Sequence, residues 1–312
     1  MMKNKCLYCY QPIDHEGDYH EKCAAEFFGL PSAPTLDYSL DEMEKLAQQT
    51  VARSVTIPGV QPKLSLSINK QPKDTRLTIV GALGGQYILK PPTDMFPELP
   101  QNEHVTMRIA ESFGIRVVPS SLIRLASGEL AYITKRIDRT DSGNKIHMLD
   151  MFQITEAFDK YRSSVERIGK AINSYSSNPL LDGLYFFEVI LFSFLTGNND
   201  MHLKNFSMIR TPIGWELTPA YDLLNVSIAL PEDTEELALT LSGKKRKLTK
   251  NHFHQFALDL GLTPKQIEGV FNRFASQKDN AIKWVEQSFL SKEMKEDYVA
   301  LLEERYGRVV EL

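Results

Sequence analysis

The pattern of hydrophobic and polar positions divides the chain into a strand-rich part followed by a helical part. Apolar and polar residues alternate with a period of two over residues 63–68, as expected for a strand with one buried face. Short β-rich segments recur up to residue 137, and Gly84-Gly85 marks a turn between two of them. We expect strands at 63–68, 75–79, 86–90, 117–124 and 130–137, and one helix at 102–113.

From about residue 148 the pattern becomes helical. Thr263-Pro264-Lys265-Gln266 is a strong helix start, with an N-cap threonine and proline at the first helical position. Trp284 and Tyr298 are expected to pack the last helices. We expect helices at 149–158, 163–173, 181–195, 252–260 and 264–278. The chain therefore predicts an α+β fold, with a β-rich first lobe and an all-helical second lobe.

The segment before the first strand divides into three pieces. Residues 1–30 are expected to form a small separate knuckle, and residues 31–38 form a linker rich in proline and small polar residues. A capping box at Ser39 and Glu42 then predicts a helix to about residue 52. The expected domains are therefore the knuckle at 1–30, the first lobe at 31–139 and the second lobe at 140–312.

Composition places the chain among ordinary globular proteins. Apolar residues make up 42% of its 312 residues and charged residues 24%, and the net charge of −4 gives no general attraction to nucleic acid or membranes. The most apolar stretch, residues 184–195, contains Glu188 and is too short to span a bilayer. Three cysteines cannot form a disulfide framework, and no signal peptide opens the chain. We therefore expect a cytoplasmic location.

The first segment contains a candidate metal site. Cys6-Leu7-Tyr8-Cys9 and His20-Glu21-Lys22-Cys23 are two pairs with two-residue spacers, ten residues apart. Three thiols and one imidazole match a tetrahedral Zn²⁺ site that leaves no open position, so the metal would be structural. The alternative is three free cysteines and a surface histidine.

Three polar residues in the second lobe have the spacing that protein kinases use for phosphoryl transfer. Asp200 and Asn205 stand five residues apart, and Asp222 follows seventeen residues later. In a kinase the first Asp accepts the proton of the attacking hydroxyl, and the Asn and second Asp hold Mg²⁺ against the phosphates of ATP. Lys204 could neutralise charge on the transferred group, and His202 could be catalytic or, as we favour, fix the loop.

The first lobe supplies candidates for holding the nucleotide. Lys90 ends a strand and could reach the phosphates, and Glu103 at the start of the following helix could pair with it. The turn at 53–63 could cradle phosphate oxygens with its backbone N–H groups. Residues 136–139 lie where a kinase has the hinge that binds adenine. Alone, each could be an ordinary strand end, helix start, turn or charged linker, but together they occur in the order that a kinase requires.

At this point the chain resembles a known family, the HipA serine/threonine kinase toxins of bacterial toxin–antitoxin systems. The resemblance covers roughly residues 50–300 and depends on motifs that recur in order, Ile57-Pro58-Gly59-Val60-Gln61-Pro62-Lys63-Leu64, Tyr87-Ile88-Leu89-Lys90-Pro91, Asn102-Glu103, residues 135–139, residues 197–207 and Pro219-Ala220-Tyr221-Asp222.

This resemblance implies a bilobal fold like that of protein kinases and of PI3/4 kinases, with Asp200 as catalytic base and Asn205 and Asp222 binding Mg²⁺. The residues implied to bind ATP are Thr56, Ile57, Pro58, Gly59, Lys90, Glu103, Lys135, Ile137 and Tyr221. Ile137 stands where phenylalanine is commoner, and Thr56 where serine is usual.

The resemblance also implies a biological role. Members of the HipA family phosphorylate aminoacyl-tRNA synthetases, which arrests translation and growth. They switch themselves off by autophosphorylation of the glycine-containing loop. Ser54 and Thr56 are the matching hydroxyls here. The short N-terminal part resembles the HipT-like toxins, for which a small separate protein supplies the missing subdomain. The expected partners are that protein and a DNA-binding antitoxin, with no membrane and only indirect or weak contact with DNA.

Two other functions remain open from the sequence. A pseudokinase module could bind nucleotide, protein or DNA without transferring phosphate, and a small-molecule kinase would use the same residues. The basic run Lys244-Lys245-Arg246-Lys247, followed by Lys250, could contact tRNA, DNA or an acidic partner, although we favour a solvated turn.

Overall fold

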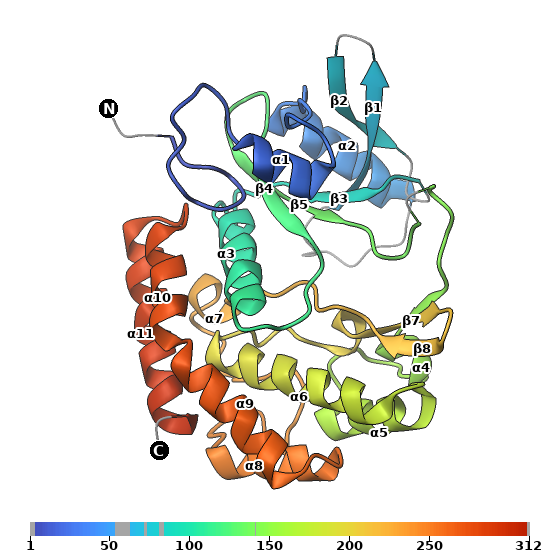
Figure 1. Cartoon of the computed structure of the whole chain (residues 1–312), viewed down its shortest axis with the longest axis vertical. Coiled ribbons are helices and arrows are strands. Elements are labelled where there is room, and N and C mark those ends of the chain that lie inside the picture. The colour runs from blue at the N-terminus through green and yellow to red at the C-terminus, as the bar shows by residue number, and fades with distance from the viewer. Residues whose placement is uncertain (1–3, 54–62, 72–73, 81–83, 141, 311–312) are drawn as a thin grey trace. The chain divides into compact units, whose positions relative to one another are not determined.

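The computed structural model describes residues 4–53, 63–71, 74–80, 84–140 and 142–310. The chain divides into two compact units (Figure 1). Unit 1 comprises residues 1–104, 118–145 and 287–289, and unit 2 comprises residues 105–117, 146–286 and 290–312. Helix α3 (Leu99–Ser112) begins in unit 1 and continues in unit 2.

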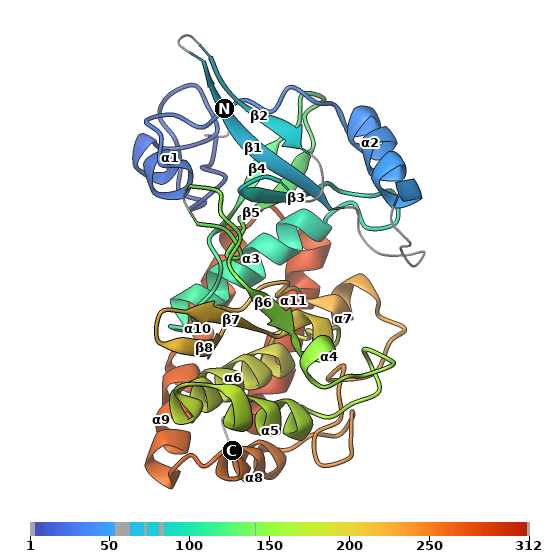
Figure 2. The same cartoon turned by 90° about the vertical axis from the view of Figure 1, so that its right-hand side faces the viewer.

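Unit 1 is built on a five-stranded antiparallel sheet with the order β2-β1-β3-β5-β4, which can be followed in Figure 2. Its strands are β1 (Leu64–Gln71), β2 (Asp74–Val80), β3 (Tyr87–Lys90), β4 (Ser120–Arg124) and β5 (Leu130–Lys135). The central strand β3 pairs Tyr87 with Lys135 and Lys90 with Tyr132. The sequence therefore predicted the strands of this unit close to their observed positions.

Two helices precede this sheet. They are α1 (Glu21–Phe28) and α2 (Leu40–Arg53). The rings of Phe27 and Phe28 pack against Tyr87 of β3, with centroids 5.9 and 6.1 Å away. The sequence predicted α2 but not α1, because α1 has only eight residues and two of its apolar positions are adjacent phenylalanines.

Unit 2 is organised around the apolar helix α6 (Pro179–Leu195). Its buried phenylalanines meet aromatic rings of other helices, for example Phe186 against Phe256 and Phe187 against Phe271. Buried Glu188 pairs with Arg273 at 2.5 Å, which explains an acid within this apolar stretch. The other helices of unit 2 are α4 (Met151–Ile154), α5 (Val165–Tyr175), α7 (Val226–Ala229), α8 (Lys250–Asp259), α9 (Pro264–Ser276), α10 (Lys278–Gln287) and α11 (Lys292–Val309).

The prediction of an all-helical second lobe is wrong. Unit 2 contains a three-stranded antiparallel sheet of β6 (Met148–Asp150), β7 (Ser207–Thr211) and β8 (Gly214–Leu217), visible in Figure 2. These strands have three to five residues and are too short for a clear period of two. The expected helix at 149–158 is likewise only α4, since Glu156 adopts φ +49° and a left-handed residue ends a helix.

The packing of the last helices follows the sequence prediction. Tyr298 is fully buried, and its hydroxyl lies 2.8 Å from that of Thr106 on α3. The ring of Trp284 lies 5.2 Å from the guanidinium of Arg108. Among the described helices, none combines the length and the apolar character needed to cross a bilayer.

Candidate active site

The loop that follows α6 carries the residues predicted for phosphoryl transfer. α6 ends at Leu195, and Gly197 then adopts φ +70°. The carbonyl of Gly197 accepts hydrogen bonds from the N–H groups of Val226 and Ser227, both at 3.0 Å. A Cβ on Gly197 would lie 2.7 Å from Oδ1 of Asn225. Glycine is therefore needed where this loop meets α7, and the loop is anchored at its first turn.

The side chain of Asn198 links the two acids of the predicted site. Its Oδ1 accepts the backbone N–H of Asp200 at 3.3 Å, and its Nδ2 donates to the carbonyl of Asp222 at 3.2 Å. Asn205 closes the other side of the loop, because its Nδ2 donates to the carbonyl of Asp200 at 3.0 Å. Asn198 is fully buried and Asn205 is 7% exposed. The three predicted residues thus belong to one hydrogen-bonded constellation within unit 2.

Asp222 and Tyr221 are held by the backbone around them. Asp222 has φ +55°, a left-handed conformation that aspartate tolerates better than most residues. The hydroxyl of Tyr221 lies 2.6 Å from Oγ of Ser207 and donates to the carbonyl of Lys204 at 3.1 Å. Tyr221 therefore ties Asp222 to the short helix η1 (Leu203–Asn205) and to β7. Its role in binding ATP stays a prediction.

The carboxylate of Asp200 has a partner that the sequence did not suggest. Tyr161, on the loop before α5, donates its hydroxyl to Oδ1 of Asp200 at 2.7 Å. Its ring meets that of His202 edge to face, with centroids 5.1 Å apart. Burial, together with the hydrogen bond to Asp200, raises the pKa of Tyr161 above its usual value, so its hydroxyl stays protonated at neutral pH.

His202 and Lys204 lie in the same loop but in different surroundings. Burial lowers the pKa of His202 below its ordinary value, although the charge of Asp200 acts in the opposite direction. A buried His202 that meets Tyr161 edge to face packs against the residue that contacts Asp200. Its Nδ1 has no hydrogen-bond partner among the described residues, so fixing of the loop by hydrogen bonds from His202 stays a prediction. Lys204 is exposed, and its ammonium lies 4.8 Å from the centre of the Phe152 ring on α4.

Unit 1 contains a buried ion pair between two other predicted residues. Nζ of Lys90 lies 2.6 Å from Oε1 of Glu103, and the side chains are 4% and 1% exposed. Lys90 ends β3, and Glu103 lies in the second turn of α3. Tyr132 of β5 pairs with Lys90 in the sheet, and the centre of its ring lies 5.2 Å from Nζ of Lys90. The ammonium therefore has a fixed position.

The segment predicted as a hinge follows β5. The N–H of Lys135 donates to the carbonyl of Pro119 at 3.0 Å, and its Nζ lies 5.7 Å from the centre of the Phe27 ring. Ile137 is half-buried. Partial burial raises the pKa of Asp138, but its hydrogen bonds with Arg136 outweigh that effect and the pKa is lowered. Contact of Lys135 and Ile137 with adenine stays a prediction.

The predicted phosphate loop, with its two hydroxyls for autophosphorylation, lies outside the described residues. It comprises Ser54, Thr56, Ile57, Pro58 and Gly59.

The basic run is partly neutralised in the structure. Nζ of Lys245 lies 2.9 Å from a carboxylate oxygen of Glu235, and Lys250 starts α8 with Nζ 5.4 Å from the centre of the Phe271 ring. These contacts are typical of a solvated turn before a helix.

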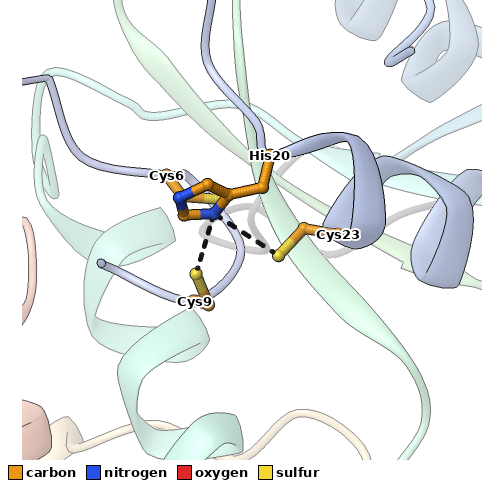
Figure 3. Close-up of side chains that lie close together, drawn as sticks. All are labelled: Cys6, Cys9, His20 and Cys23. Carbon is orange, nitrogen blue, oxygen red and sulfur yellow. Dashed lines mark hydrogen bonds between the residues drawn. The ribbon is translucent and has the colours of Figure 1, made fainter. Parts of the chain in front are cut away.

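The four predicted metal ligands come together at the start of unit 1 (Figure 3). Their ligand atoms, from Cys6, Cys9, His20 and Cys23, all lie within 4.8 Å of one another. A hydrogen bond between Cys6 and Cys9 lowers the pKa of the Cys6 thiol and raises that of Cys9. Burial raises the pKa of Cys23. Opposite pKa shifts of this kind are typical of neighbouring thiols that share one hydrogen bond.

Comparison with known proteins identifies the family of the chain. The family model described as "HipA-like C-terminal domain" matches residues 55–282. A protein of Haemophilus influenzae named "Putative kinase" is 30% identical over 287 residues, which cover 82% of each chain. The serine/threonine-protein kinase toxin HipA of Shewanella oneidensis is 30% identical over 203 residues, 58% of this chain but only 45% of the toxin.

Two solved structures share the fold. One is HipA of Shewanella oneidensis in its complex with HipB and operator DNA, with a TM-score of 0.67 and 24% identity over 82% of this chain and 66% of that one. The other is the proinflammatory kinase CtkA of Helicobacter pylori, with a TM-score of 0.54 and 16% identity over 72% of this chain and 88% of that one. The architecture is thus a mixed α/β kinase-like fold. Since the family model covers most of the chain, the protein belongs to the HipA-like family.

Proposed function

We propose that the protein is a serine/threonine kinase that transfers the γ-phosphoryl group of ATP to a protein hydroxyl. The observation that carries this proposal is the bridge made by Asn198 between Asp200 and Asp222. It fixes the backbone of a proton acceptor beside that of a metal-binding acid, an arrangement that phosphoryl transfer needs. The names of these relatives, which all describe kinases, support the same class of reaction.

In this mechanism Asp200 orients the acceptor hydroxyl and takes its proton. The hydroxyl oxygen bonds to the γ-phosphorus, the bond from that phosphorus to the bridging oxygen of ADP breaks, and the proton passes to Asp200. Tyr161 already donates to one carboxylate oxygen of Asp200, which leaves the other oxygen to receive the substrate hydroxyl. Tyr161 thereby acts as a positioning residue.

Asn205 and Asp222 are the residues that would hold Mg²⁺. The amide nitrogen of Asn205 donates to the carbonyl of Asp200, so the amide oxygen is the atom that can ligate a cation. A carboxylate and an amide oxygen are the hard ligands that Mg²⁺ prefers. When bound, the ion neutralises charge on the phosphates of ATP.

Lys90 would hold the phosphates of ATP through its ammonium. Its pairing with Glu103 fixes the position of a buried charge, which lowers the entropy cost of binding a phosphate. Lys135 and Ile137 would contact the adenine.

The proposed biological role is that of a toxin whose substrate is an aminoacyl-tRNA synthetase. The Shewanella relative is named a kinase toxin, and its solved complex contains HipB and operator DNA. We therefore propose a DNA-binding antitoxin as partner, together with a small protein that resembles the N-terminal subdomain of the HipA toxins. Phosphoproteomics after brief expression tests the substrate. Synthetase phosphorylation that is absent with Asp200→Asn supports the role, and unchanged synthetases exclude it.

Autophosphorylation at Ser54 and Thr56 is proposed as the off-switch. Added phosphates in a phosphate-binding loop would repel ATP or displace the loop. The variant with both Ser54→Ala and Thr56→Ala should show no added phosphate in its intact mass and should arrest growth more strongly. Unchanged phosphate content in that variant would count against the switch.

The kinase activity itself is tested by labelled phosphate transfer from ATP, with wild type and Asp200→Asn side by side. Transfer by the wild type alone supports the proposal. ATP binding without any transfer would instead identify a pseudokinase.

A further inference from the structure

We propose that Cys6, Cys9, His20 and Cys23 bind one structural Zn²⁺ ion, independently of the kinase chemistry. The four ligand atoms lie within 4.8 Å of one another, and Figure 3 shows their side chains pointing toward a common centre. They come from two places in the chain, the turn at residues 6–9 and the first turn of α1, where His20 is the N-cap and Cys23 is the third helical residue.

Two nitrogen–sulfur distances in the cluster are close to those of a tetrahedral zinc centre. With Zn–S bonds of about 2.3 Å and a Zn–N bond of about 2.05 Å, tetrahedral angles place a sulfur about 3.6 Å from the nitrogen. Nδ1 of His20 lies 3.4 Å from Sγ of Cys9 and 3.8 Å from Sγ of Cys23. His20 and these two cysteines therefore already lie at distances from which they could bind one ion.

The orientation of His20 is a second, independent observation. Its other ring nitrogen, Nε2, lies 3.1 Å from the carbonyl oxygen of Pro12. A carbonyl can only accept, so Nε2 carries a hydrogen, and Nδ1 is the nitrogen that faces the sulfurs and can offer a lone pair to a metal. Ligating histidines typically donate their second N–H to such an outer partner.

The ligand set argues for a structural metal and for zinc. Four protein ligands leave no position for water or substrate, as in closed zinc sites. Three thiolates and one imidazole suit Zn²⁺, whereas Mg²⁺ and Ca²⁺ prefer oxygen ligands. Cys6 is fully buried and Cys23 is 8% exposed, so the ion would be shielded from solvent.

The segment that carries the site has little regular secondary structure, so a bound metal would stabilise it. Between Asn4 and His20 the chain forms turns, bends and isolated bridges but no helix or strand. It nevertheless contacts the rest of unit 1, since the carbonyl of Leu7 accepts the N–H of Leu122 on β4. A metal that joins this segment to α1 supplies the stability that so short a stretch cannot gain from a core of its own.

Contacts of Tyr10 also connect the proposed zinc site to the helix that carries Glu103 of the buried ion pair. Tyr10 directly follows Cys9, and its hydroxyl lies 2.7 Å from Nδ1 of His104, the residue after Glu103. The two rings meet edge to face at 5.3 Å. Zinc at the cluster would therefore fix the surroundings of the α3 turn that carries Glu103.

The test measures metal content and thermal stability in the full chain, so it does not depend on catalysis. The matched variants are His20→Ala and His15→Ala, which make the same change at a ligand and at an exposed histidine five residues earlier. We expect about one zinc per chain in wild type and in His15→Ala, and a several-fold lower content in His20→Ala. We also expect the melting temperature of His20→Ala to lie on the order of 5 °C below that of His15→Ala.

A second measurement covers the case in which His20→Ala does not fold. Wild-type protein treated with a zinc chelator should release about one equivalent of zinc and lose thermal stability, and added Zn²⁺, but not Mg²⁺, should restore it. The proposal is overturned if wild-type protein contains no zinc, contains iron instead, or has an intact mass that reveals a disulfide. Equal zinc in His15→Ala and His20→Ala would also overturn it.

Discussion

The buried pair of Lys90 and Glu103 allows structure and function to be separated by a double-mutant cycle. The two charged groups are 2.6 Å apart, with side chains 4% and 1% exposed. Removing either partner breaks a buried ion pair and leaves the other charge in the interior without this pairing, which costs about 3–5 kcal/mol. We therefore expect Lys90→Met and Glu103→Leu each to destabilise the protein by this amount.

The double variant should behave differently. Replacing both members of a buried pair by apolar side chains of similar size is often close to neutral, so we expect it within about 1 kcal/mol of wild type. At about 2.1 cal/mol/K per residue, the 312 residues have an unfolding entropy of about 0.65 kcal/mol/K. The single variants should then melt roughly 5–8 °C below wild type, and the double variant within about 2 °C.

Function should not recover with stability, because the phosphates of ATP would still lack the ammonium. The cycle compares the melting temperatures and the ATP affinities of wild type, the two single variants and the double variant. The reasoning is refuted if the double variant is as unstable as the sum of the single variants, or if it binds ATP and transfers phosphate as wild type does. The first result would show that the two charges do not stabilise each other. The second would show that Lys90 does not hold the phosphates of ATP.

Three further predictions concern the loop around Asp200. Asn198→Ala removes both bonds of the bridge and should lower kcat on the order of 10- to 100-fold with KM for ATP little changed. The adjacent control Asn199→Ala, whose amide donates to the carbonyl of Glu235, should cost clearly less, and equal losses would contradict the role of the bridge. Tyr161→Phe should lower kcat about tenfold in steady-state assays without changing the melting temperature by more than about 2 °C, and an unchanged kcat would contradict its positioning role. The lowered pKa of His202 means that the unfolded chain binds its proton more readily, so its contribution to stability is present above the unfolded pKa of about 6.5 and is lost as pH falls below that value. The free energy of unfolding, measured by denaturant titration at pH 7.5 and 5.5, should therefore change less with pH in His202→Gln than in wild type, by at most about 1.4 kcal/mol per pH unit, and an equal change would exclude this cause.

The sequence predicted those features that depend on local pattern and spacing. The period of two located β1, β-rich composition located the other strands of unit 1, and the apolar run at 181–195 located α6 with only its first two residues missing. The spacing of the two pairs at residues 6–9 and 20–23 identified four side chains that the fold brings together. In each case the chemistry or periodicity lies within a short stretch of chain.

The sequence could not predict contacts that depend on distant segments. Tyr161 lies 39 residues before Asp200, in a loop with no motif, and only the fold places its hydroxyl on that carboxylate. Asn198 was visible in the motif, but its bridge to Asp222 depends on a turn 24 residues later. The strands β6, β7 and β8 were missed for a similar reason, because their pairing is tertiary and their sequences are short.

The central claim, that Asp200 serves as proton acceptor in phosphoryl transfer, is tested most directly by the rate of phosphate transfer from ATP. The measurement compares wild type with Asp200→Asn and with Asp297→Asn, the same change at an exposed aspartate on α11. Loss of a general base predicts a rate lower by about 10²- to 10⁴-fold in Asp200→Asn and an unchanged rate in Asp297→Asn. Equal rates in all three proteins, or no transfer by the wild type, would contradict the account.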